Sequence, residues 1–118
     1  RQRMFFPALK AVVLIKEASE RNVIASMLES TGLTVIVNSG DIACLETHAK
    51  LHPDVLIVDD DILDDPTRVL LREPDFYNKL ILIRRSSDHT DETLCLTDLV
   101  RPVYRSELLR VICGIMNS

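Results

Sequence analysis

The chain has 118 residues, 47% of them hydrophobic, so it is large enough and apolar enough to bury one core of its own. It contains no internal repeat and no low-complexity segment, which argues against a solenoid and against disorder. The net charge of −4 argues against nucleic-acid binding as the main function, because binding to a phosphate backbone needs a basic face.

The apolar runs and the cysteines indicate where the protein works. The longest apolar run near the start, residues 11–15, is far too short to cross a membrane or to form the core of a signal peptide. The three cysteines lie far apart without Cys-x-x-Cys spacing, which is typical of reduced thiols. We therefore expect a cytoplasmic domain without direct membrane contact. Because the first residue is an arginine, we also expect it to be part of a longer protein.

Short apolar runs alternate with amphipathic segments in the first part of the chain. Residues 12–15 and 33–37 have the apolar, β-branched composition of buried strands. Between them, apolar residues at helical spacing predict a helix over 19–30, with Ser19 as its N-cap and Gly32 as its stop.

The alternation continues through the middle of the chain. Residues 41–51 predict a second helix, and residues 55–58 predict a third strand, the clearest of all. An acidic loop follows, and either Asp64 or Asp65 is expected to cap a short helix over 67–72.

The last part of the chain completes the pattern of an α/β fold. Residues 80–83 and, more weakly, 96–100 predict the fourth and fifth strands, and Ser106 is expected to cap a final helix. Strands that alternate with helices need right-handed crossovers and a parallel sheet covered on both faces. The sequence therefore predicts a doubly wound, five-stranded parallel sheet, whose site should lie at the carboxyl ends of the strands.

Charged residues follow four of the five predicted strands. They are Lys16 and Glu17 after the first strand, Asp59 after the third, Arg84 and Arg85 after the fourth, and Arg101 after the fifth. Asp59 also opens a run of three aspartates. We expect these side chains to form a crevice of mixed charge, with acids at its centre and bases around it.

Several segments resemble the receiver domains of response regulators and hybrid histidine kinases. Residues 53–59, PDVLIVD, resemble the family's PDLVLLD segment, whose closing aspartate is phosphorylated. Residues 99–102 and 107–109 are similar to its YLxKP and ELL ending, and residues 15–32 fit its VDDxxxxR…G frame. The resemblance covers nearly all of residues 10–117 and implies a flavodoxin-like fold and a role in two-component, phosphorelay signal transduction.

The resemblance places the phosphoacceptor position at Asp59, but its surroundings depart from the family. Two acids after the first strand help the family to hold Mg²⁺, whereas here Lys16 replaces the first and only Glu17 remains. Arg84 stands where the family has a Ser or Thr that bonds the phosphoryl group, and Arg101 replaces a lysine. We therefore expect an altered pocket without a bound metal, in which Glu17 and Asp59 are only weak candidates as ligands.

Two more departures concern the family's conformational switch. Its aromatic switch residue falls at about Asp98. Only 16 residues separate Arg84 from Arg101, so the fourth helix, between the fourth and fifth strands, is expected to be short or absent. In active receivers that region forms much of the output and dimerisation face, so both departures point away from ordinary switching.

Asp59 has two interpretations. In the favoured one it is a structural partner of Lys16, in a pocket that Lys16, Arg84 and Arg101 neutralise and hold in one conformation. In the alternative, Asp59 is a working phosphoacceptor, and only then is Mg²⁺ expected as a cofactor.

A further hypothesis concerns a group of basic and aromatic residues expected near one edge of the sheet. Arg84, Arg85, Tyr104 and Arg105 would bind a small ligand such as a cyclic dinucleotide, because arginine grips phosphates and stacks on bases. The favoured alternative is that these arginines pair with nearby acids.

The remaining motifs do not indicate catalysis. The sequence lacks a Ser-His-Asp or Cys-His arrangement, a Gly-rich phosphate loop and a nucleotide fingerprint, so we expect no independent enzyme activity. His48 and His52 have the spacing of metal ligands on a helix, but Pro53 ends that helix, and solvated helix-end residues are the better interpretation.

These predictions combine into one expected architecture. Residues 1–9 are predicted to be a linker and residues 10–118 a receiver-like domain. We expect a pseudo-receiver within a sensor histidine kinase, which acts by docking against other domains of that kinase or against a partner signalling protein. No nucleic acid and no cofactor are expected.

Overall fold

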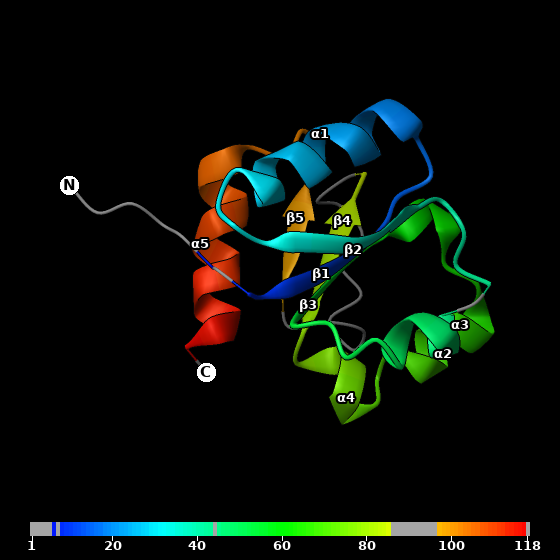
Figure 1. Cartoon of the computed structure of the whole chain (residues 1–118). Coiled ribbons are helices and arrows are strands. Elements are labelled where there is room, and N and C mark those ends of the chain that lie inside the picture. The colour runs from blue at the N-terminus through cyan, green and yellow to red at the C-terminus, as the bar shows by residue number, and fades with distance from the viewer. Residues whose placement is uncertain (1–5, 7, 44, 86–96, 118) are drawn as a thin grey trace.

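In the computed structural model of the chain, residues 6, 8–43, 45–85 and 97–117 are described, and they contain a five-stranded parallel sheet. The strands are β1 (Lys10–Leu14), β2 (Thr34–Ser39), β3 (Val55–Asp59), β4 (Leu80–Arg84) and β5 (Asp98–Val100). Their order is β2-β1-β3-β4-β5 (Figure 1), which is the order of flavodoxin-like sheets. The predicted doubly wound fold is therefore confirmed.

Helices cover both faces of this sheet. They are α1 (Ala18–Glu29), α2 (Leu45–Ala49), α3 (Asp65–Leu70), α4 (Pro74–Tyr77) and α5 (Arg105–Met116), with a short 3₁₀ turn at Asp60–Ile62. Helices α1 and α5 lie on one face, and α2, α3 and α4 lie on the other (Figure 1).

Each face of the sheet has its own hydrophobic core. Ile24 of α1 and Leu108 of α5 belong to one cluster, whereas Leu45 of α2 and Phe76 of α4 belong to the other. Alternate residues of β3 and β4 enter the two clusters, and every residue of both strands is buried. Strands covered on both faces need such a continuous apolar run.

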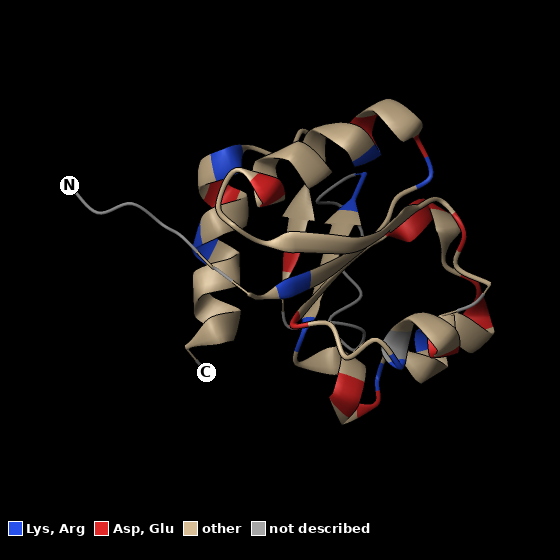
Figure 2. Cartoon of the chain, viewed as in Figure 1, with Lys and Arg blue, Asp and Glu red and all other residues tan. Residues whose placement is uncertain are grey.

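Charged residues in the strands occupy only terminal positions. Lys10 begins β1, Asp59 ends β3, Arg84 ends β4 and Asp98 begins β5. Figure 2 shows the middles of the strands free of charge, with charged residues on helices and connections. The carboxyl ends of β3 and β4 therefore bring an acid and a base to the same edge of the sheet.

The N-caps of the first and last helices differ from the prediction. Glu17 caps α1, because its carboxylate accepts hydrogen bonds from the main-chain N–H of Glu20 at 3.1 Å and from the hydroxyl of Ser19 at 2.6 Å. Tyr104 occupies the cap position of α5 without a side-chain capping bond, and Ser106 lies inside the helix. Both predicted serine caps were wrong, because a carboxylate does the capping at α1 and no side chain does it at α5.

Only part of the predicted second helix is helical. The carboxylate of Asp41 accepts a hydrogen bond from the main-chain N–H of Ala43 at 2.8 Å. Such a local bond offers the backbone an alternative to the helix. The helix therefore begins later than predicted, at Leu45, and the chain leaves it through His52 in a left-handed conformation (φ 51°).

The region after β3 is partly as predicted. Asp64 caps α3, since its carboxylate accepts a hydrogen bond from the main-chain N–H of Thr67 at 2.9 Å. Helix α3 begins two residues earlier than predicted, at Asp65, and the helix α4 that follows was not predicted. Helix α1 ends at Glu29 with Ser30 as its C-cap, and Gly32, in the turn that follows, has a φ of 89°, a backbone conformation that favours glycine.

Two predictions fall wholly or largely on residues that the structure does not describe. The fourth-helix prediction concerns residues 86–96, which lie outside the described residues, as does most of the predicted linker 1–9. Phe6 is described: its main-chain N–H donates to the carbonyl of Thr31 at 2.6 Å, and it packs on the core under α1 and α5. Across the described ranges, no helix has the length and apolar character needed to span a membrane.

Candidate functional site

The predicted crevice is present at the carboxyl ends of the strands. It is a cavity of about 410 Å³ lined by Lys16, Glu17, Glu20, Asp59, Asp61, Arg85 and Arg101. Four of the predicted site residues, Lys16, Glu17, Asp59 and Arg101, therefore come together, with Arg85 at the same cavity. The sheet topology explains why these residues meet, because β1 and β4 both pair with β3 and their carboxyl ends lie at the same edge.

Asp59, the last residue of β3, lies at the centre of the crevice and is only 1% exposed. One carboxylate oxygen accepts the main-chain N–H of Lys16 at 3.0 Å. The other accepts the main-chain N–H of Asp61 at 2.9 Å and the guanidinium of Arg101 at 2.6 Å. The buried carboxylate thus has three donors, one of them a cation.

These donors determine the charge state of Asp59. Burial raises the pKa of Asp59, because it penalises the ionised form. The hydrogen bonds from Asp61, Arg101 and Lys16 lower it by more, so that the pKa lies below its ordinary value of 3.8. Asp59 is therefore ionised at neutral pH.

Arg101 connects Asp59 to a second acid, Glu20 of α1. Its Nε contacts both carboxylate oxygens of Glu20, at 3.0 and 2.8 Å. A third acid, Asp60, lies 3.7 Å from Arg101 Nη1. Burial lowers the pKa of Arg101, but the hydrogen bonds to Asp59 and Glu20 outweigh this and raise it. A guanidinium held on both sides by carboxylates is fixed in place.

Lys16 contacts Asp59 through its main chain and not, as expected, through its side-chain ammonium. Its side chain is exposed, and Arg101 is the ion-pair partner of Asp59 within the described residues. Lys16 instead contributes its main-chain N–H to Asp59. The expected pairing of the Lys16 ammonium with Asp59 was therefore wrong, because the guanidinium of Arg101, at 2.6 Å, is the cation that pairs with this carboxylate.

Glu17 lines the crevice, but its carboxylate caps the N-terminus of α1. Its carboxylate bonds to Ser19 and to the main-chain N–H of Glu20, and these hydrogen bonds lower the pKa of Glu17. An acid engaged in capping a helix is committed to that geometry.

Arg84 is buried and pairs with Asp98 on the neighbouring strand. The Nε of Arg84 lies 2.5 Å from a carboxylate oxygen of Asp98, and their side chains are 8% and 32% exposed. The register of β4 and β5, which pairs Leu82 with Asp98 and Arg84 with Val100, brings the two residues together. In the sequence, Arg84 and Asp98 each differ from the residue that receivers have at that position. The contact between them was not predicted.

The predicted ligand-binding group does not come together as one site. Arg84 pairs with Asp98, Arg85 pairs with Asp61 at 2.7 Å, and Arg105 contacts the hydroxyl of Ser30 on α1. Tyr104 is 60% exposed. The structure thus favours the alternative interpretation for Arg84 and Arg85, namely arginines paired with nearby acids.

Three consecutive carboxylates could in principle attract a metal. Oxygen atoms of Asp59, Asp60 and Asp61 lie within 4.8 Å of one another, and Mg²⁺ prefers oxygen ligands. However, Asp59 and Asp61 already pair with Arg101 and Arg85, at 2.6 and 2.7 Å. A Mg²⁺ ion would have to displace both arginines, so these side chains as they stand do not fit it.

Sequence reasoning missed one residue of the site, Glu20, whereas the run of three aspartates had already placed Asp60 and Asp61 after the third strand. Glu20 stands three residues after the capping Glu17, a spacing that places an acid in the first turn of a helix. That signal predicts the turn but not the contact with Arg101, which is 81 residues away in the chain.

Comparisons with known proteins identify the fold. No protein-family model matches the chain, and no curated protein matches it. Among solved structures, it is similar to the receiver domain of a sensor histidine kinase from Pseudomonas aeruginosa PAO1, with a TM-score of 0.75 and 21% identity over 93% of this chain and 98% of the other. That receiver domain has a magnesium ion in its active-site cleft.

Two further solved structures have the same fold. A receiver protein from Burkholderia phymatum matches with a TM-score of 0.70 and 18% identity, over 92% of this chain and 95% of its own. The receiver domain of a histidine kinase from Syntrophus aciditrophicus matches with a TM-score of 0.74 and 18% identity, over 93% and 91%. The chain therefore has the fold of the receiver domains of two-component signalling.

Proposed function

We propose that this chain is a degenerate receiver domain of two-component signal transduction, a pseudo-receiver that regulates by contact with other proteins and does not accept phosphate. The observation that carries this proposal is the state of Asp59, whose carboxylate is 1% exposed and engaged by Arg101 at 2.6 Å and by two main-chain N–H groups.

A phosphoacceptor aspartate must present an oxygen to the phosphodonor. Here Arg101 covers that carboxylate and is itself tied to Glu20. Breaking a charged hydrogen bond of this kind costs about 1.5–3 kcal/mol. Freeing Asp59 therefore requires Arg101 to give up a favourable ion pair.

Metal binding meets the same obstacle. The acids nearest to Asp59 are paired with arginines or cap a helix, and the exposed Lys16 adds a positive charge at the crevice. We therefore propose that the domain works without Mg²⁺, although the receiver domain from Pseudomonas aeruginosa binds it.

The pair of Arg84 and Asp98 supports the loss of switching. In the receivers that the sequence resembles, these positions hold a hydroxyl residue and an aromatic residue that move together on phosphorylation. Two opposite charges at 2.5 Å take their place in this chain. A pair that is largely buried on the Arg84 side favours one fixed arrangement.

The setting of the domain is part of the proposal. The solved structures that share its fold include receiver domains of sensor histidine kinases. We propose that residues 1–9 link this domain to such a kinase in the cytoplasm, and that its partners are other domains of that kinase or a second signalling protein. No catalytic activity of its own is proposed.

Phosphorylation by acetyl phosphate with Mg²⁺ tests the proposal, with intact-mass spectrometry as the readout. We expect the chain to remain unmodified. A matched variant, Lys16→Asp with Arg84→Thr, Asp98→Tyr and Arg101→Lys, restores family residues at four altered positions, including the arginine that covers Asp59, and is expected to gain a phosphoryl group. Adding Asp59→Asn to that variant should abolish the gain, which identifies the acceptor.

The second candidate function is a working phosphoacceptor at Asp59. The observation in its favour is the cluster of three aspartate carboxylates within 4.8 Å, which could gather around a cation if the arginines moved away. Stoichiometric modification of the unaltered chain, lost in Asp59→Asn, would establish this function and overturn the pseudo-receiver.

A further inference from the structure

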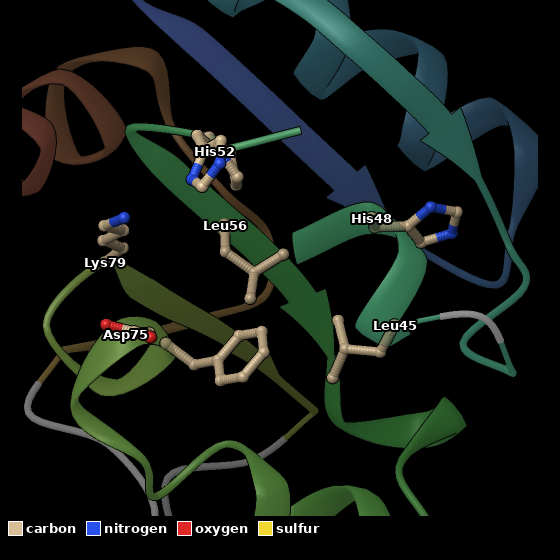
Figure 3. Close-up of a pocket in the computed structure, with 8 residues that line it drawn as sticks. Leu45, His48, His52, Leu56, Asp75 and Lys79 are labelled. Atoms are coloured by element: carbon tan, nitrogen blue, oxygen red, sulfur yellow. The ribbon is translucent and has the colours of Figure 1, made fainter. Parts of the chain in front are cut away.

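A second cavity lies away from the crevice, near the amino end of β3. It has a volume of about 220 Å³ and lies between α2, the start of β3 and α4 (Figure 3). At about 30 Å³ per water molecule, it has room for roughly seven waters. Pockets for drug-sized ligands start at about 300 Å³, so this one suits a smaller molecule.

The helices on this face of the sheet are short. Helix α2 has 5 residues, α3 has 6 and α4 has 4. The floor is apolar, because Leu45, Leu56 and Phe76 of the second core line it, and each is less than a tenth exposed. An apolar floor reached from solvent is suited to an aliphatic group.

The rim carries two opposite charges at one end. Asp75 and Lys79 lie on the same side of the cavity, while His48 lies toward the other side on α2 (Figure 3). Over the described part of the chain, neither Asp75 nor Lys79 forms an ion pair. The cavity therefore offers an acid and a base, both without an ion-pair partner among the described residues, next to an apolar floor.

We propose that this cavity binds a small zwitterionic amino acid with an aliphatic side chain, of the size of leucine. Lys79 would hold the α-carboxylate, Asp75 the α-ammonium, and the floor formed by Leu45, Leu56 and Phe76 the side chain. A simple carboxylate would meet the like charge of Asp75, and a simple amine would meet that of Lys79. A ligand that carries both charges gives Asp75 and Lys79 each an opposite partner.

An NMR titration of the whole chain tests this proposal without reference to the phosphorylation crevice. The probes are L-leucine, isocaproate, which lacks the ammonium, and isoamylamine, which lacks the carboxylate. We expect L-leucine to shift the amide peaks of Leu45, Leu56 and Phe76 in a saturable way. The two truncated probes should bind at least about tenfold more weakly, since each leaves one charge without a partner.

Two nearly isosteric variants test the assigned charges. Asp75→Asn and Lys79→Gln should each weaken L-leucine binding about tenfold or more. Glu46→Gln and Lys50→Gln are matched controls on α2 and just after it; both residues are exposed and do not line the cavity. The proposal is overturned if L-leucine gives no saturable shift, if isocaproate binds as tightly as L-leucine, or if the variants bind like the controls.

Discussion

The carboxylate of Asp59 has two competing roles open to it, that of an ion-pair partner and that of a phosphoacceptor. In a pocket of mutually repelling acids, removing one carboxylate relieves repulsion and stabilises the fold. In this chain Arg101 bridges Asp59 and Glu20, so removing the charge of Asp59 takes away an attraction. The sign of the effect on stability therefore distinguishes the two arrangements.

Asp59→Asn should lower the free energy of unfolding by about 1–3 kcal/mol at pH 7, because it removes a charged hydrogen bond to Arg101 while keeping the side-chain volume. Urea denaturation measures this difference. Glu29→Gln, an exposed acid on α1, is the control and should stay within about 0.5 kcal/mol of the unaltered chain. A more stable Asp59→Asn protein would contradict the assigned ion pair.

The same variant should show a defined pH dependence. The pKa of Asp59 is lowered in the folded chain, so the stability it contributes is complete above its ordinary value of 3.8 and is lost as the pH falls through the lower, folded value. The difference in unfolding free energy between the unaltered chain and Asp59→Asn should thus be constant near neutral pH and shrink in acid. A difference that grows on acidification would refute this assignment.

Arg84 and Asp98 should be energetically coupled. A double-mutant cycle with Arg84→Met and Asp98→Asn is expected to give a coupling energy of about 1–3 kcal/mol in chemical denaturation. Asp98→Asn should be the more harmful single change, because the Arg84 side chain is 8% exposed and its charge stays buried. Additive single effects would show that the pair does not hold β4 and β5 together.

At the scale of elements, the strands were predictable and the helix limits were not. Residues of β3 and β4 form continuous apolar runs, and such runs have few alternatives to a buried strand. Capping and helix length depend on local hydrogen bonds, such as the one from Ala43 to Asp41 that delays the start of α2. Helix α4, with four residues, is too short to show a helical period.

The residues of the crevice were predictable for a related reason, since they follow strands whose carboxyl ends meet. The ion-pair partners of these residues could not be predicted from the sequence. Arg101 contacts Glu20 across 81 residues and Asp59 across 42, and no spacing in the sequence encodes such a pairing. Distinguishing a Lys16 partner from an Arg101 partner required side-chain positions.

Helix α3 offers a test of a single capping bond. Asp64→Ala removes the acceptor for the main-chain N–H of Thr67 and should destabilise the fold by about 1 kcal/mol. Glu73→Ala is the matched control, because Glu73 caps α4 without a side-chain hydrogen bond and should matter much less. Thermal unfolding of both variants checks the prediction, and equal losses would contradict it.

At the scale of the whole molecule, a receiver-like sheet carries an ion-paired crevice at one end of its strands and an apolar cavity toward the other. The two sites share β3, whose last residue is Asp59 and whose second residue, Leu56, lines the cavity. The proposed function, regulation by contact with partners, requires a crevice that keeps one arrangement whether or not phosphate is present. The central claim is therefore that the crevice does not respond to a phosphate mimic.

The most direct measurement compares amide NMR spectra of the chain with and without Mg²⁺ and beryllofluoride, which together mimic an aspartyl phosphate. The account predicts that the peaks of Asp59, Arg84 and Arg101 stay in place. If these peaks move together and saturate, the arginines do not hold the crevice closed, and the domain is a phosphoacceptor that switches.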